Sequence, residues 1–302
     1  LVWAGLLVNM GGVFVDLPEG QRGFLKQPKG LAPGQRILVQ VAGTAEAGKA
    51  TPLTLRLLFK SRYAIVTPGS PGLNISRSIR DSELRTELEG LATAGMAGAA
   101  EDIGLILRSA CETAETDEIT EDITNMRQLA EAVLADVQGA PELLLDAPGP
   151  HEQAWRDWGD VDEVDTSAES LDHSGALDQI EALAAPMVML DGGASMVIEA
   201  TRALIAVDVN TGNDTSPASG LKASLAAARD LPRQLRLRGM GGIVVIDLAP
   251  CPKRDRHVVE QVLSKAFRAD PGEANLAGWT PLGNFELTRK RDRPPLAAWL
   301  NA

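Results

Sequence analysis

Short apolar runs separated by glycine and proline turns fill the first 62 residues. Runs of this length with turn residues between them are typical of β-strands. The predicted strands lie over residues 11–17, 23–25, 36–41 and 52–59. Several short strands at this spacing favour a small barrel.

From residue 63 the pattern changes to a mixture of helices and strands. Apolar residues recur at three- and four-residue steps over 82–97 and 120–137, which predicts a helix in each range. The apolar run at 104–109 predicts a strand between them. Residues 147–178 are rich in Pro, Gly and Asp, and we expect a loop or a poorly packed connection there.

The periodic pattern is strongest after residue 190. The predicted elements are strands over 194–199 and 203–210, a helix over 221–237, a strand over 243–247, a helix over 255–266 and a strand over 283–287. The first two strands are close enough to form a hairpin. Pro232 predicts a kink or a restart in the long helix. Together these patterns predict an α+β chain of several domains.

Charge is distributed unevenly along the chain, whose net charge is −12. Residues 101–190 contain 22 acidic and three basic side chains, whereas residues 1–62 contain three acidic and eight basic ones. Residues 191–302 are also slightly basic. Basic segments on either side of an acidic one suit RNA contacts at both ends. The acidic segment can also serve solubility alone, and both interpretations can hold together.

Several classes of protein are disfavoured by composition. No apolar run approaches the ~20 residues of a membrane-spanning helix. The opening stretch has no basic leader and no small-residue cleavage site, so it does not resemble a signal peptide. Cys111 and Cys251 form no CxxC pair and no Cys/His array. Two reduced thiols in a cytoplasmic protein are therefore expected.

Polar side chains stand at the ends of two predicted strands. Asp208 and Asn210 are two residues apart and so face the same way, and Asp247 ends the apolar strand 243–247. Two adjacent carboxylates repel each other, and a divalent cation relieves that repulsion. Mg²⁺ fits because it takes oxygen ligands and keeps several waters, one of which can attack a phosphodiester. The alternative is that Asp208 caps a turn and Asp247 caps the next helix.

A row of arginines follows the predicted helix 221–237. Arg229, Arg233 and Arg236 fall on one face of it, and Arg238 lies just beyond. Each guanidinium group can bind a phosphate through two donors, which suits phosphodiester recognition. A solvated basic face that binds nothing explains the same row.

Three blocks of sequence resemble the catalytic core of the ribonuclease E/G family in order and spacing. They are Asp-Val-Asn-Thr-Gly at 208–212, Arg-Gln-Leu-Arg-Leu-Arg at 233–238 and Gly-Gly-Ile-Val-Val-Ile-Asp at 241–247. The resemblance extends over nearly the whole chain. It implies an OB-type RNA-binding β-barrel over 1–62, a mixed α/β 5′-phosphate sensor over 63–145, a remnant ribonuclease-H-like or connecting segment over 146–190, and a deoxyribonuclease-I-like catalytic domain over 191–302.

The resemblance also implies residue roles in catalysis and sensing. Asp208 and Asp247 match the family's two magnesium-binding aspartates, and Asn210 matches the amide that assists them. Arg108 and Ser109 match the pair that grips a 5′-monophosphate on RNA, and serine keeps the hydroxyl that this contact needs.

Other matched residues concern RNA binding. Phe14 and Phe24 match aromatic residues that contact single-stranded RNA, where rings can stack on bases. Taken alone, two such rings are more often core residues. Arg233, Arg236 and Arg238 belong to the matched arginine block and are expected to bind RNA phosphates.

The implied activity is cleavage of single-stranded RNA by a magnesium-activated water, with Mn²⁺ as a possible substitute. The family's Cys-Pro-x-Cys zinc link is not matched, because Cys251 is followed by Pro252 and no second cysteine. No zinc is therefore expected, and a homo-oligomer would form without a zinc link. Pro250 stands where many members have an acid. The alternative function is therefore RNA binding with weak or lost catalysis.

Overall fold

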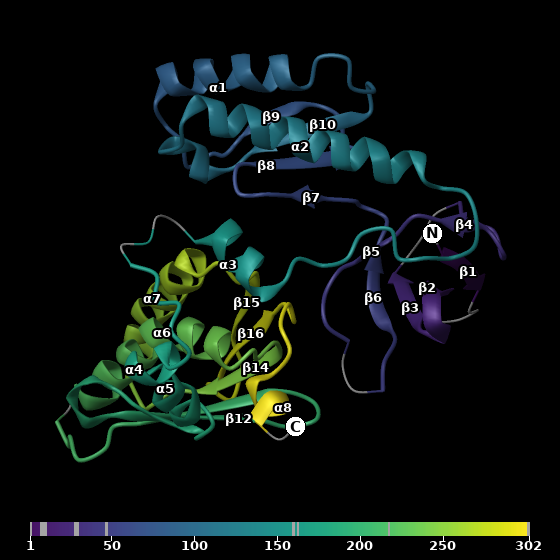
Figure 1. Ribbon diagram of the computed structural model, residues 1–302. Coiled ribbons are helices and arrows are strands. Elements are labelled where there is room, and N and C mark those ends of the chain that lie inside the picture. The colour runs from purple at the N-terminus through teal and green to yellow at the C-terminus, as the bar shows by residue number, and fades with distance from the viewer. Residues whose placement is uncertain are drawn as a thin grey trace. The chain divides into compact units, whose positions relative to one another are not determined.

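The computed structural model describes residues 2–6, 11–26, 30–45, 48–158, 161, 163–216 and 218–300. The chain divides into two compact units, residues 1–164 and 165–302 (Figure 1). Two hydrophobic cores lie in the first unit and one in the second. Within the described residues, no helix is long and apolar enough to cross a membrane.

The first core belongs to a sheet with the strand order β4-β1-β2-β3-β6-β5. The strands are β1 (Val2–Leu6), β2 (Gly12–Asp16), β3 (Arg22–Lys26), β4 (Arg36–Ile37), β5 (Gln40–Val41) and β6 (Thr51–Thr54). The described strand pairs leave β4 and β5 as edges, so they do not form the closed barrel that was expected. Each of the longer predicted strands, 36–41 and 52–59, is split into two short ones.

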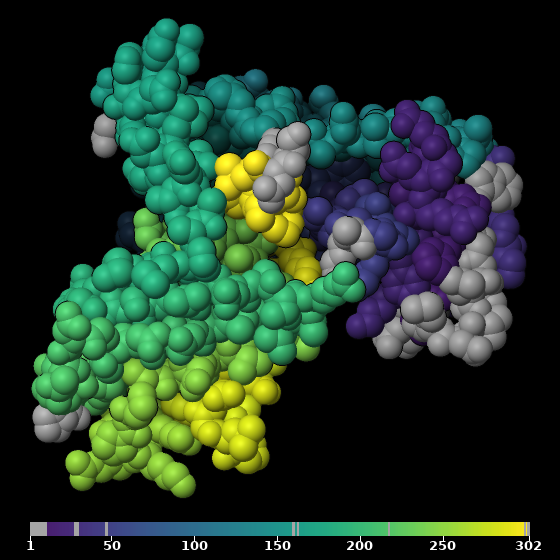
Figure 2. Space-filling view, turned by 90° about the horizontal axis from the view of Figure 1, so that it is seen from below, coloured from purple at the N-terminus to yellow at the C-terminus, as the bar shows by residue number. Residues whose placement is uncertain are grey.

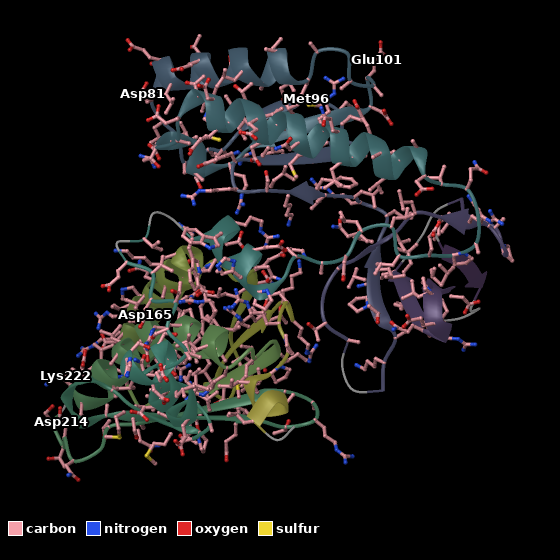
Figure 3. All side chains as sticks on the ribbon, in the orientation of Figure 1. Asp81, Met96, Glu101, Asp165, Asp214 and Lys222 are labelled. Carbon is pink, nitrogen blue, oxygen red and sulfur yellow. The ribbon has the colours of Figure 1, made fainter. Side chains whose placement is uncertain are left out.

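The second core lies between a four-stranded sheet and two helices. The sheet has the order β7-β8-β10-β9 and consists of β7 (Phe59–Lys60), β8 (Ala64–Pro68), β9 (Leu73–Ile75) and β10 (Ile103–Leu107). Figure 1 shows the helices α1 (Ser82–Gly95) and α2 (Thr116–Ala135) on one side of this sheet, close to their predicted ranges. Asp81 caps α1 by accepting hydrogen bonds from the backbone N–H groups of Glu83 and Leu84 (Figure 3).

Three short helices follow, and none of them contains a buried residue. They are α3 (Pro150–Asp157), α4 (Ser170–His173) and α5 (Ala176–Ala182). The sequence predicted a loop or a poorly packed connection over 147–178, and short helices without buried residues fit the second of these. The segment that follows residue 165 forms much of the surface of the second unit seen in Figure 2.

The third core belongs to the second unit and its six-stranded sheet, in the order β11-β12-β13-β14-β16-β15. The strands are β11 (Met187–Met189), β12 (Ser195–Ala200), β13 (Ile205–Asn210), β14 (Gly242–Asp247), β15 (Ala274–Trp279) and β16 (Phe285–Arg289). The helices are α6 (Ser219–Leu237), α7 (Arg256–Ala269) and α8 (Leu296–Leu300). The predicted hairpin is confirmed as β12 and β13, which pair antiparallel. The sequence patterns did not predict β11, β15 or α8.

Only one face of this sheet is buried. Alternate residues of β13 and β14, among them Val207 and Ile246, pack in one core with residues of α6 and α7 such as Leu231 and Leu263. The helix α6 continues through the buried Pro232, so no restart occurs there. The opposite face of the sheet is open: Met189 at the edge strand is 68% exposed. Short 3₁₀ helices complete the described elements, at Pro18–Gly20, Ser109–Glu112, Asp191–Gly193 and Lys253–Asp255.

Candidate catalytic site

Two carboxylates lie side by side on the open face of the second unit's sheet. The strands β13 and β14 are parallel neighbours, and Asp208 stands opposite Asp247 in their register. Both side chains are exposed, while Val207 and Ile246, one position before them, are buried against the helices. Adjacent strands are about 4.8 Å apart, so the two carboxylates project from neighbouring backbones toward the same solvent. Asp247 ends its strand and Asp208 lies two residues before the end of its own, so both are near the carboxyl ends, where open α/β sheets bind ligands.

Asn210 joins this pair through a hydrogen bond. Its Nδ2 atom donates to Oδ2 of Asp208 over 2.8 Å, on the same face of β13. This bond leaves the other oxygen of Asp208 and the amide oxygen of Asn210 accessible. The arrangement orients one carboxylate without neutralising it, as supporting residues of metal sites do.

The loops at this end of the sheet are held by close backbone contacts. Gly212 has a φ of +63°, and a Cβ atom there would lie 2.1 Å from the carbonyl oxygen of Gly193. A Cβ atom at Gly220 would lie 1.8 Å from the carbonyl oxygen of Pro250. Only glycine permits these approaches. They bring the loop after β13 and the loop after β14 against their neighbours, and so fix the ends of both strands.

An ion pair further restrains the loop between β13 and α6. Lys222 on the first turns of α6 lies 3.6 Å from Oδ2 of Asp214, and the two residues are neighbours in Figure 3. Asp214 also accepts a hydrogen bond from the backbone N–H of Ser216 over 2.8 Å. This hydrogen bond is the main reason why the pKa of Asp214 lies below its ordinary value.

The donor set consists of oxygen atoms, which suit a hard cation such as Mg²⁺. Mg²⁺ is commonly held by one or two carboxylates and keeps several waters. Asp208 and Asp247 supply two carboxylates, with the Asn210 amide beside them. Within the described ranges, no group of three or more His, Cys, Asp or Glu residues is placed to hold a metal.

The arginine row does not lie with these carboxylates. The helix α6 packs on the buried face of the sheet, opposite to the face that carries Asp208 and Asp247. It also runs back toward the start of β14, whereas Asp247 is the last residue of that strand. The length of β14 corresponds to roughly 16 Å. The row and the two carboxylates therefore lie on opposite sides of the sheet, and the role of the row in phosphate binding stays a prediction.

The individual arginines have partners within the second unit. Arg236 forms an ion pair with Asp270, which also accepts a hydrogen bond from Arg289 over 2.9 Å. Arg238 is 4% exposed and donates to Gln234 and to the carbonyl oxygen of Ala185.

Exposure separates the row into two groups. Arg229 and Arg233 are exposed, and Arg233 lies 3.4 Å from Asp230. Arg238, by contrast, does not present its guanidinium group to solvent as phosphate binding requires. The exposed arginines of α6 are the ones available to a phosphate backbone.

A second group of predicted residues meets in the first unit. Arg108 and Ser109 directly follow β10, and β9 runs parallel to β10 with Ile75 opposite Leu107. The backbone N–H of Ser76 donates to the carbonyl oxygen of Leu107 over 2.8 Å. The ends of β9 and β10 therefore lie side by side, next to Arg108 and Ser109. Ser109 is exposed.

Arg108 is surrounded by acceptors from two directions. Its Nη1 atom donates to the carbonyl oxygens of Ser61, over 2.5 Å, and Arg156, over 3.2 Å. Its Nη2 atom donates to Oδ1 of Asp157 over 3.0 Å. Sequence reasoning missed Arg156 and Asp157. Charge was the signal that could have found them. Residues 101–190 contain 22 acidic side chains and only three basic ones, and Arg156 is one of these three.

Phe14 and Phe24 face each other across β2 and β3. They are register partners, with ring centroids 5.4 Å apart in an edge-to-face arrangement. Both are half-buried and lie on the face opposite Val15 and Leu25, which form the core of this sheet. A Cβ atom at Gly12 would lie 2.5 Å from the Phe24 ring, so glycine makes room for it. The alternative that these rings are core residues does not match this placement.

The two thiols are separate and form no disulfide. Cys111 is buried, and burial raises its pKa to about 11. Burial also raises the pKa of Cys251 above its ordinary value. Both are poor nucleophiles at neutral pH, since the thiolate is the reactive form.

The sequence matches the family model described as the Ribonuclease E/G family, over residues 59–170 and 160–292. Similar proteins include a ribonuclease E of Nostoc sp., 31% identical over 86% of this chain and 44% of the relative. Another is ribonuclease E of Escherichia coli, 28% identical over 88% of this chain and 29% of the relative. Ribonuclease G of Salmonella typhimurium is 28% identical over 86% of this chain and 60% of its own length. The chain thus spans less than two thirds of each of these relatives.

Proposed function

The chain belongs to the ribonuclease E/G family, and on that premise we propose that it is an endoribonuclease that cleaves single-stranded RNA with a bound magnesium ion. The observation that carries the proposal is the register pair of Asp208 and Asp247 on the open face of the sheet. Two like charges on neighbouring strands repel each other, a divalent cation would relieve that repulsion, and both side chains are exposed.

In this mechanism Asp208 and Asp247 would hold the ion, and through it the scissile phosphate. The ion supplies an activated water and polarises a phosphate oxygen. Asn210 holds one oxygen of Asp208 through a hydrogen bond, and the other oxygen would be left to bind the ion. Cleavage in this way leaves a 5′-phosphate on the downstream product. Mn²⁺ has similar ligand preferences and is expected to replace Mg²⁺.

We further propose that the first unit binds the substrate. Phe14 and Phe24 are half-buried on the face of the sheet opposite its core, where their rings could stack on bases, and the OB-type domain implied by the resemblance uses such rings. Arg108 and Ser109 would bind the 5′-monophosphate of the RNA, through the guanidinium group and the hydroxyl. In the second unit, Arg233 is exposed and can contact the phosphate backbone. Arg236 and Arg238 already have partners within the second unit, which supports a structural role for these two residues.

The direct experiment is incubation of the protein with a 5′-labelled single-stranded RNA, with magnesium in one sample and EDTA in the other. We expect internal cleavage with magnesium, none with EDTA, and recovery when magnesium or manganese is restored in excess. Cleavage that persists in EDTA would refute the metal mechanism. Binding without cleavage under every condition would refute the enzymatic activity.

A second candidate is an RNA-binding protein of the same family with weak or lost catalysis. Pro250 favours it, because this exposed residue stands three positions after Asp247, where many family members have an acid. A supporting carboxylate near the ion is therefore missing. The Pro250→Asp variant separates the two functions. A rise in magnesium-dependent cleavage would mean that the natural chain is a weakened enzyme, and an unchanged rate would mean that Pro250 is not a limitation.

A further inference from the structure

Two arginines converge on one carboxylate in the first unit. Arg156 is bidentate: its Nε atom donates to Oδ1 of Asp157 over 3.0 Å, and its Nη2 atom donates to Oδ2 over 2.8 Å. Arg108 comes from a different part of the chain, and its Nη2 atom donates to Oδ1 of Asp157 over 3.0 Å. The carboxylate therefore lies between two guanidinium groups, one from the end of β10 and one from α3.

This donor set is the kind that proteins use for phosphate. A guanidinium group presents two parallel N–H donors, which match the oxygens of a phosphate as well as those of a carboxylate. Arg108 is held in place by the carbonyl oxygen of Ser61, so its orientation does not depend on Asp157 alone. The exposed Ser109 follows it directly. The two guanidinium groups thus form a binding site for an anion, and in this structure the carboxylate of Asp157 fills it.

The carboxylate is well bound but accessible. Its pKa is lowered to about 2, chiefly by the hydrogen bonds from Arg156, so it is fully ionised at neutral pH. The Asp157 side chain is 43% exposed, and those of Arg108 and Arg156 are 26% and 23% exposed. Partly exposed ion pairs are modest in strength. A ligand with higher charge can therefore enter from solvent and displace Asp157 from the two arginines.

We propose that Arg108 and Arg156 together form the binding site for a terminal phosphate, and that Asp157 occupies this site until the phosphate displaces it. The proposal rests on the proposed 5′-phosphate sensing and deepens it: it adds Arg156 as a phosphate-binding residue and Asp157 as an internal competitor. A 5′-monophosphate carries a charge of about −1.5 to −2, which exceeds that of a carboxylate. An RNA that begins with a 5′-hydroxyl cannot displace Asp157.

The test compares two oligonucleotides of one sequence, with a 5′-monophosphate or a 5′-hydroxyl, by fluorescence anisotropy in EDTA so that no cleavage occurs. Asp157→Asn should tighten binding of the 5′-monophosphate form about threefold or more, because the competing charge is removed. It should leave the 5′-hydroxyl form unchanged. Arg156→Gln should weaken binding of the 5′-monophosphate form alone. Glu163→Gln is the matched control, since Glu163 is exposed and its loss changes net charge by the same amount.

Opposite effects of Asp157→Asn and Arg156→Gln on this affinity are the decisive result. If α3 had a purely structural role, both variants would change the affinity in the same direction. Equal tightening by Glu163→Gln would mean a general charge effect and would overturn the proposal. If Arg108→Ala abolishes the preference for the 5′-monophosphate while Asp157→Asn has no effect, sensing stands and the competitor role fails. If neither the natural chain nor Asp157→Asn distinguishes the two oligonucleotides, 5′-phosphate sensing itself fails.

Discussion

Asp208 and Asp247 are register partners on adjacent parallel strands, and both project from the face of the sheet that no described helix covers. The two residues are 39 positions apart in sequence. They are brought together because α6 carries the chain across the buried face and returns it to the start of β14, as in other βαβ units.

Removal of either carboxylate should abolish magnesium-dependent cleavage. We expect Asp208→Asn and Asp247→Asn each to lower the cleavage rate by about 100-fold or more, since the ion loses a charged ligand. RNA affinity in EDTA should stay nearly the same. Glu199→Gln is the matched control, because Glu199 is exposed on the same face and one strand away. An equal loss in the control, or full activity in both Asp variants, would contradict the assignment.

Loss of the Asn210 amide should weaken the site without destroying it. Asn210→Ala removes one hydrogen bond to Asp208, so we expect cleavage to fall about tenfold and the magnesium requirement to rise. Titration of the rate with magnesium measures both effects. A lower rate that no magnesium concentration improves would show that Asn210 acts on the substrate rather than on the metal ligand.

The two phenylalanines should affect RNA binding more than stability. Phe14→Ala and Phe24→Ala should each weaken binding of single-stranded RNA by about 1–3 kcal/mol, the usual contribution of one stacked base. Leu25→Ala is the contrasting variant: Leu25 is 4% exposed, and its loss should lower the free energy of unfolding by about 2–5 kcal/mol. Urea denaturation and anisotropy measure the two quantities separately. Phe variants that unfold as easily as Leu25→Ala would indicate a core role.

The cluster around Asp270 should matter for folding rather than for catalysis. The side chains of Asp270 and Arg289 are each 2% exposed, and Arg236 is paired with the same carboxylate. Asp270→Ala leaves a buried guanidinium group uncompensated, which should lower the free energy of unfolding by about 3–5 kcal/mol.

The control for this cluster is Arg233→Ala, which removes an exposed arginine of the same helix and should change stability by less than about 1 kcal/mol. Its effect should instead appear as weaker RNA binding with a smaller dependence on salt. Thermal or urea denaturation of both variants checks the contrast. Similar stability in Asp270→Ala and Arg233→Ala would show that the buried cluster is not a folding element.

Strong local periodicity made the helices and the central strands predictable. The helix predicted over 221–237 is α6, and the hairpin predicted before it is β12 and β13. The strand β15 was missed because Gly278 near its end weakens the strand pattern, and because among the described strands it pairs with β16 alone. These residues form a strand because they pair with β16, and their own sequence does not indicate it.

The sequence by itself determined which residues share a face. The period of two along β13 placed Asp208 and Asn210 on one side of the strand, and the period of 3.6 placed Arg229 and Arg233 together on one helix. These relations are local, so they hold wherever the elements lie.

Only the tertiary structure decided how those faces meet. The register of β13 and β14 placed Asp247 beside Asp208, while the packing of α6 on the buried face turned the arginine row away from both. Tertiary structure also decided the contact between Arg108 and Asp157, since Asp157 ends α3 and lies 49 positions further along the chain. Register and packing depend on contacts between distant segments, and hydrophobic burial selects them for the chain as a whole.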